Sequence, residues 1–238
     1  MGSGPAVRRS LRSAARALAS ALLDLVYPPR CAACGEAGAE PFCAICAEAI
    51  EEVPRGCPRC GVPGLPEVCG ACLAAPPAFD AVRAGGLLGG PLADAVHALK
   101  YRQRPALARP LGRWLAHRIA LPAGAAVVAV PLAPGRRRTR GYDQAALLAD
   151  HLARAAGAPR LRAVLRRVRE TAPQVGRSRA GRAVNVRGAF AASRRAAGRD
   201  LVLLDDVVTT GATADAAAEA LRRAGARSVV VVALARAE

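Results

Sequence analysis

All eight cysteines of this 238-residue chain lie in one short block, arranged as four C-x-x-C pairs. The two halves of the block, CAACGEAGAEPFCAIC and CPRCGVPGLPEVCGAC, share the spacing C-x2-C-G-x7-C-x2-C. A C-x-x-C turn directs two thiolates at one point, and two such turns complete a tetrahedral Zn–S4 site. The repeat therefore predicts two closed, structural zinc ions, with the ligands Cys31, Cys34, Cys43, Cys46, Cys57, Cys60, Cys69 and Cys72.

Other uses of paired cysteines fit this block less well. A disulfide framework is typical of small secreted domains, but the sequence shows no recognisable secretory signal, and disulfides do not require C-x-x-C pairing throughout. A thioredoxin-like redox pair needs one motif beside a βαβ unit rather than four in tandem. The spacing leaves open whether each repeat binds its own ion or the pairs interleave. Sequential pairing follows more simply from the repeat.

Beyond a proline-marked break at LAAPPAF, short apolar runs alternate with segments of helical period. The runs AVVAVP, LVLLDDVV and SVVVVALA predict strands that are buried on both faces. PLADAVHALKY, PALARPLGRWLAHRIA, QAALLADHLARAAG and TADAAAEALRRAGA predict helices. This order predicts an α/β fold, with a mostly parallel sheet and flanking helices, whose ligands bind at the carboxyl ends of the strands. We expect an N-terminal helix over 1–30, a zinc-binding module over 31–75 and the α/β domain over 76–238.

Two adjacent aspartates, Asp205 and Asp206, end one of the predicted strands, and T-T-G-A-T follows where the next helix begins. The free backbone N–H groups and the dipole of a helix N-terminus bind phosphate well. Carboxylates beside such a cradle would repel a bare polyphosphate, but they suit a sugar phosphate whose hydroxyls donate hydrogen bonds. The spacings of the P-loop and of the dinucleotide-binding fingerprint are absent. An ordinary turn with a threonine N-cap would account for Thr213 but not for the aspartates.

The formal net charge of +17 comes almost entirely from arginine, and Lys100 is the only lysine. A field of this sign attracts polyanions such as nucleic acid, phosphorylated metabolites or an acidic membrane surface. The basic segment VRRSLRSAARALASALLDLVY has a helical period but lacks the uninterrupted apolar region of a signal peptide. No membrane span is predicted, and we expect a cytoplasmic protein.

The stretch LVLLDDVVTTGAT resembles the phosphoribosyl pyrophosphate (PRPP) motif of type I phosphoribosyltransferases. With the C-x-x-C array, GPLADAVHALKY, VPLAPGRRRTRGYDQAALLA and QVGRSRAGRAVNVRGAF, it makes the chain similar to the ComF (ComFC-like) competence family from about Leu22 to Arg236. The resemblance implies a type I phosphoribosyltransferase-like fold that binds PRPP, or another ribose 5-phosphate, with Mg²⁺. It also implies an association with DNA uptake, with single-stranded DNA and other DNA-uptake proteins as partners.

The same resemblance implies roles for individual residues. The ribose hydroxyls would be held by Asp205 and Asp206, and the 5′-phosphate by Thr209, Thr210, Gly211, Ala212 and Thr213. A loop after AVVAVP would bring Arg136, Arg140 and Gly141 to the pyrophosphate, with Lys100 as a further cation. A covering loop would contain Gln174, Ser178, Arg182 and Asn185. Three residues depart from the family pattern: Asp143 replaces an asparagine, Arg177 an apolar residue and Leu88 an aromatic one.

Two classes of function follow. A phosphoribosyltransferase must neutralise the leaving pyrophosphate and shield ribose C1 from water. No acceptor or catalytic base stands out, because His97, His117 and His151 lie in helical patterns as expected for structural or surface residues. The alternative is a non-catalytic protein that handles single-stranded DNA, with the PRPP site vestigial or regulatory. Its arginine clusters at 136–138, 160–169 and 177–187 would contact phosphates, because seven aromatics are few for base stacking.

Overall fold

A computed structural model of the chain describes residues 28–64, 66–169, 186 and 188–237. Most of the expected N-terminal helix over 1–30 lies outside the described residues. The expected covering loop with Gln174, Ser178, Arg182 and Asn185 also lies outside them, as does Arg177. None of the described helices has both the length and the hydropathy that a membrane crossing needs.

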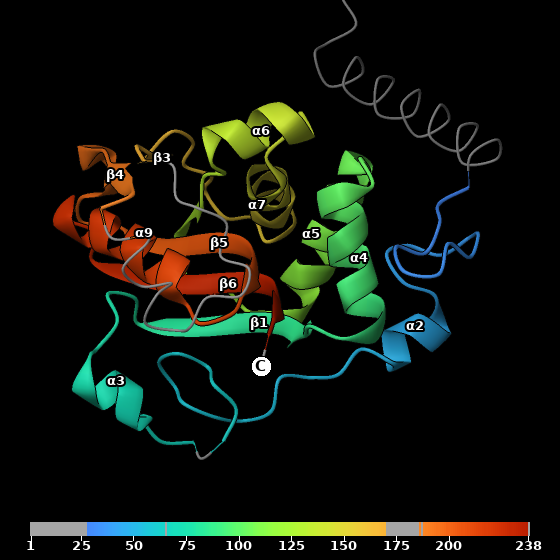
Figure 1. Ribbon diagram of the computed structural model, residues 1–238, viewed down its shortest axis with the longest axis horizontal. Helices are drawn as coiled ribbons and strands as arrows, with labels where there is room; N and C mark the ends of the chain where they lie inside the picture. Colours follow the sequence, from blue (N-terminus) through green and yellow to red (C-terminus); the bar gives the residue numbers. More distant parts are fainter. Residues whose placement is uncertain (1–27, 65, 170–185, 187, 238) are drawn as a thin grey trace, which may run out of the picture.

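A four-stranded parallel sheet forms the centre of the molecule, as Figure 1 shows. Its strand order is β1-β6-β5-β2, with β1 at Ala81–Leu87, β6 at Ser228–Arg236, β5 at Asp200–Val208 and β2 at Ala126–Ala129. Three of these strands are the predicted apolar runs, and the parallel α/β fold is confirmed. A separate antiparallel pair joins β3 (Leu165–Arg167) and β4 (Phe190–Ala192).

Helices cover both faces of the sheet (Figure 1). On one face, α4 (Gly90–Tyr101), α5 (Ala108–Arg118) and α7 (Gln144–Ala155) pack against Val202 and Leu204 of β5. On the other face, α9 (Ala212–Arg223) packs against Leu201 and Leu203. Alternate residues of a strand point to opposite faces, so the continuous apolar run of β5 supplies two hydrophobic cores.

The segment after β2 is mostly helical rather than a loop. Helix α6 spans Pro134–Arg140, with proline in its first turn and Gly141 in the left-handed conformation (φ 82°) as its C-cap. Proline at the start and glycine just past the end are standard helix boundaries, and arginine is a good helix former. The expectation of a loop here was therefore wrong, and Arg136 and Arg140 project from a short helix. Among the described residues, short 3₁₀ turns also occur at Pro105–Leu107 and Arg194–Ala196.

The two cysteine repeats pack on opposite faces of the sheet and are joined around the β1 edge. The first repeat, with α2 (Ala44–Glu48), sets Phe42 against Trp114 of α5, with ring centroids 5.5 Å apart. The second repeat, with α3 (Gly70–Ala74), belongs to the same core as α9. The connecting segment runs below β1 in Figure 1, where the N–H of Leu87 donates to the carbonyl of Glu51 at 2.8 Å.

Candidate functional site

The eight cysteines form two tetrads, one in each repeat, and both are candidate metal centres. Within each tetrad all four Sγ atoms lie within 4.8 Å of one another. The Sγ–Sγ distance is 3.8 Å for Cys34 and Cys43, and 3.7 Å for Cys60 and Cys69. A tetrahedral zinc ion with Zn–S bonds of about 2.3 Å requires sulfur atoms about 3.8 Å apart. The tetrads therefore fit zinc, and the pairing is sequential: Cys31, Cys34, Cys43 and Cys46 in one, and Cys57, Cys60, Cys69 and Cys72 in the other.

Backbone N–H groups point at sulfur in the same way in both repeats. Burial raises the pKa of Cys31 and Cys57, but backbone N–H groups, including those of Cys43 and Cys69 respectively, outweigh it and lower the pKa of both thiols to about 6. Burial raises the pKa of Cys46 to about 12. Four clustered sulfurs of this kind suit a cation that holds all of them as thiolates, which is how zinc binds cysteine.

Strand β5 carries Asp205 and Asp206 to the carboxyl edge of the sheet, and Asp206 points toward α4 and α7. The Nζ of Lys100 lies 2.8 Å from Asp206 Oδ1, and the Nε2 of Gln144 donates to Asp206 Oδ2 at 2.7 Å. Asp206 is 4% exposed, and a buried carboxylate requires such partners. The only lysine of the chain is thus an ion-pair partner inside the site.

Gln144 is a site residue that the sequence interpretation missed. Its Oε1 atom is buried and accepts no hydrogen bond from the described residues. Buried acceptors are normally satisfied by protein, water or ligand. The available signal was the position of this amide in the apolar stripe of α7, where Ala145, Leu148 and Leu152 are buried.

Asp205 faces a small hollow at the start of α9. Burial raises the pKa of Asp205 to about 7, with a further contribution from the neighbouring Asp206 charge, whereas Lys100 and the Asp206 N–H oppose the rise. A buried carboxyl prefers its neutral form because a low-dielectric site disfavours charge. Asp205 is therefore a carboxylate whose ionised form calls for a donor or cation, which a ligand can supply.

The hollow brings Asp205 together with Thr209, Thr210, Gly211, Ala212 and Thr213, and its volume is about 20 Å³. Gly211 is the N-cap of α9 with φ 80°, a conformation that glycine adopts readily. Thr213 therefore lies in the first turn rather than at the N-cap. Thr210 Oγ1 accepts a hydrogen bond from the N–H of Ala212 at 3.4 Å. The arrangement is a helix N-terminus bordered by hydroxyls and one carboxyl group.

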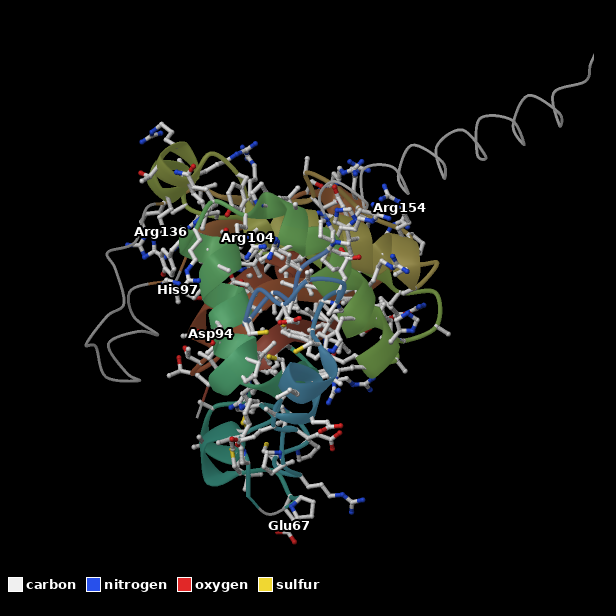
Figure 2. All side chains as sticks on the ribbon, turned by 90° about the vertical axis from the view of Figure 1, so that its right-hand side faces the viewer. Glu67, Asp94, His97, Arg104, Arg136 and Arg154 are labelled. Atoms are coloured by element: carbon white, nitrogen blue, oxygen red, sulfur yellow. The ribbon has the colours of Figure 1, made fainter. Side chains whose placement is uncertain are left out.

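The residues expected near the pyrophosphate, Arg136, Arg140 and Gly141, have different surroundings. The guanidinium of Arg140 lies 5.3 Å from the ring centroid of Tyr101, and its Nη1 is buried with no hydrogen-bond partner in the described part of the chain. Arg136 is exposed, and Figure 2 shows it on the same side of the molecule as His97 of α4. Gly141 ends α6.

The hydrogen bonds of Asp143 explain why an aspartate replaces the asparagine of the family pattern at this position. Its Oδ1 accepts the N–H of Ala146 as the cap of α7, and its Oδ2 accepts the N–H of Leu132, both at 3.0 Å. Two backbone donors compensate the charge that this acid adds, and an asparagine could not accept both bonds in this way. Next to it, the hydroxyl of Tyr142 donates to the carbonyl of Leu99, which ties the start of α7 to the residue before Lys100.

Comparisons with known proteins agree with both parts of the chain. The family model described as "Double zinc ribbon domain" matches residues 22–73, and "Phosphoribosyl transferase domain" matches residues 142–238. The glutamine PRPP amidotransferase from B. subtilis, a solved structure, aligns over 58% of this chain and 27% of its own. It is 26% identical with a TM-score of 0.36, which is too low to establish a shared fold.

Two curated relatives are similar over most of their length. "DNA utilization protein YhgH" of Salmonella typhi is 36% identical over 204 residues, and "Competence protein F" of Haemophilus influenzae is 32% identical over 210 residues. Each alignment covers 82% of this chain and 90% of the relative. The chain therefore belongs to the ComF family of competence and DNA-utilization proteins, with a double zinc ribbon and a phosphoribosyltransferase-type domain.

Proposed function

We propose that this protein binds PRPP, or another ribose 5-phosphate, at the hollow between Asp205 and residues 209–213, and that it acts in DNA uptake or utilization. The observation that carries the proposal is the meeting of a high-pKa carboxyl group with a glycine-capped helix N-terminus. The N–H groups of α9 would receive the 5′-phosphate. The ribose hydroxyls would donate to Asp205, whose ionised form they stabilise.

The two aspartates then have different tasks. Asp205 would be the main acceptor for the ribose, because it borders the hollow. Asp206 accepts bonds from Lys100 and Gln144, but a carboxylate offers about four lone-pair sites. Asp206 can therefore share a hydroxyl donor while Lys100 and Gln144 hold it in place.

Magnesium fits the same edge of the sheet. Carboxylate and substrate oxygens are the ligands that Mg²⁺ prefers, and it commonly binds through one or two carboxylates together with phosphates. Asp205 is the group here that would gain from such a cation. When bound, Mg²⁺ would screen the charge of the pyrophosphate, and Arg140 would add a guanidinium donor to the same anion.

A thermal shift tests the proposal. PRPP with Mg²⁺ at one hundred times its dissociation constant adds about 2.7 kcal/mol, or roughly 5–10 °C in Tm for a chain of this size. Asp205→Asn should lose most of this shift. Glu67→Gln, an exposed position outside the lining of the hollow, is the matched control and should keep it. A parent protein that shows no shift at millimolar PRPP would contradict the proposal.

A second function, single-stranded DNA binding, is favoured by the exposed arginines of α6. Arg136, Arg137 and Arg138 all face solvent in a chain of net charge +17. Arginine contacts with phosphates release counterions, so affinity falls steeply with salt, by about 0.7 in log–log slope per phosphate on a single strand. Charge and a PRPP site are compatible, because a basic surface can surround the hollow.

Fluorescence anisotropy with a dT20 oligonucleotide over a salt series measures this second function. The triple variant Arg136→Gln, Arg137→Gln and Arg138→Gln should bind more weakly and with a slope smaller by about 1–2. The double variant Arg109→Gln and Arg113→Gln removes exposed charges from α5 and is the control. A salt response that is flat in the parent protein would exclude phosphate-driven binding.

A further inference from the structure

A cavity with a volume of about 400 Å³ lies at the free edge of β1. Its walls come from the second zinc repeat, the segment before it, β1 and the end of α5. It shares no lining residue with the hollow at Asp205. Its size is within the range of ligand sites, and the proposed functions do not use it.

The cavity exposes part of a strand edge. β1 pairs with β6 on one side only. Backbone groups of alternate strand residues point to opposite sides, and the contacts of Gly85 and Leu87 show which residues face outward. Gly85 accepts from Arg118 Nε at 3.0 Å, and the Leu87 N–H donates to Glu51 at 2.8 Å. Arg83 therefore also faces outward.

The outward N–H and C=O groups of Arg83 have no hydrogen-bond partner among the described residues. Glu51 and Arg118 cover the carboxyl-terminal half of the edge, and the cavity begins where this cover stops. An uncovered edge strand is a template for another strand. Addition of an extended peptide to a sheet edge is a common mode of recognition.

The charge of the cavity selects the kind of peptide. Arg83, Arg118 and Arg236 line it, and the described lining residues include no aspartate or glutamate, although the exposed Glu52 lies 3.5 Å from Arg118 Nη2. Arg236 is 5% exposed and donates to the carbonyl of Cys60 at 2.6 Å, so the second zinc repeat holds this cation in the wall. Guanidinium groups bind carboxylates with strong, often bidentate hydrogen bonds. A peptide that complements the charge of this cavity is therefore acidic.

The backbone distinguishes a peptide from a nucleic acid. The edge at Arg83 offers an alternating donor and acceptor, which another peptide strand satisfies completely. A phosphodiester offers acceptors only and would leave the Arg83 carbonyl without a donor. Pro54, Val82 and Ile119 add apolar surface beside the arginines, which suits a strand whose side chains alternate in direction.

We propose that the free edge of β1 binds an extended acidic peptide of a partner protein as a fifth strand, with carboxylates on Arg83 and Arg118. The site is distinct from the PRPP hollow and joins the zinc repeat to the sheet. It gives the double zinc ribbon a role in partner binding in addition to its structural role.

The probe is a display library of random decapeptides, panned against the full-length, zinc-loaded protein with Arg83→Glu as counter-selection. The enriched sequences should be acidic, with apolar residues between the acids. Measured by anisotropy, their affinity should fall about tenfold for Arg83→Gln, which removes one charge-assisted contact. Arg83→Pro also removes the outward N–H and should lower the affinity by about a further three- to tenfold.

Proline is tolerated at an edge position whose N–H points to solvent, so the β1–β6 pairing should survive. Zinc content and the PRPP-induced Tm shift check that both variants remain folded. Equal binding to Arg83→Gln and Arg83→Pro would overturn strand addition. The proposal also fails if no peptide depends on Arg83, or if dT20 competes for the site and loses affinity with the same variants.

Discussion

Asp205 and Asp206 are neighbours in the chain, but β5 turns them toward different surroundings. Asp206 is held by an ion pair with Lys100 and a hydrogen bond from Gln144. Asp205 borders the hollow, with its pKa raised to about 7 by burial and by Asp206. One carboxylate is therefore fixed by the fold, and the other depends on what occupies the site.

This difference predicts a pH dependence of stability. The pKa of Asp205 is raised above the value of about 3.9 in an unfolded chain, so the folded state holds an extra proton between about pH 4 and pH 7. Its stabilising contribution is complete below the unfolded pKa and is lost as the pH rises through 7. Asp205 is only partly buried and borders the hollow, so solvent screens part of this effect, and we expect a loss of about 1 kcal/mol between pH 5 and pH 8.

Urea unfolding at several pH values, with Asp205→Asn as the comparison, measures this contribution. The variant has no carboxyl group to titrate at this position, so its free energy of unfolding should fall less over the same range. In the parent protein, saturating PRPP with Mg²⁺ should abolish the extra fall in the free energy of unfolding between pH 5 and pH 8, because ligand donors stabilise the ionised form of Asp205. Parallel pH profiles for parent and variant would show that the surroundings of Asp205 do not raise its pKa.

At the scale of elements, β1 depends on its glycines. A Cβ atom at Gly86 would lie 2.8 Å from the carbonyl oxygen of Glu51, and one at Gly85 would lie 2.6 Å from the Trp114 ring. Both distances are shorter than normal contact. The two glycines allow the segment between the zinc repeats to pass close to the strand while α5 packs on its face.

Gly86→Ala should lower the free energy of unfolding by about 1–3 kcal/mol, because a backbone carbonyl cannot move aside as a flexible side chain can. Gly89→Ala, two residues after β1, is the matched control: a Cβ there meets nothing within 4 Å, and its φ of −153° suits any residue. Urea denaturation compares the two variants. Equal stability would mean that the connecting segment is not held against β1.

The same strand shows why part of the fold was not predictable. β2, β5 and β6 are continuous apolar runs, so their burial can be predicted from the local sequence alone. In β1, Arg83 and two glycines interrupt the pattern, and the glycines are explained only by contacts with Glu51 and Trp114. The role of Gln144 was likewise hidden, because its partner Asp206 is 62 positions away. The cysteine ligands were predictable because their spacing alone defines the tetrad.

At the scale of the whole molecule, the zinc repeats hold the sheet from both faces. Cys46 and Phe42 belong to the core beneath α4, α5 and α7, whereas Cys57 and Phe79 belong to the core beneath α9. Loss of zinc from the first repeat should therefore loosen the packing on the face covered by α4, α5 and α7. Loss of zinc from the second repeat should loosen the packing on the face covered by α9. The single tryptophan, Trp114, lies against Phe42 and reports on the first repeat only.

Two double variants test this arrangement, Cys31→Ser with Cys46→Ser, and Cys57→Ser with Cys72→Ser. Each should retain one zinc ion by elemental analysis and lose about 3–5 kcal/mol of unfolding free energy. Only the first should change Trp114 emission. Interleaved pairing predicts instead that each variant loses both ions, because each removes a ligand from both sites. A third variant, Cys31→Ser with Cys57→Ser, gives the opposite pattern. It should lose both zinc ions if the pairing is sequential, because the two cysteines then belong to different sites. It should keep one ion if the pairing is interleaved.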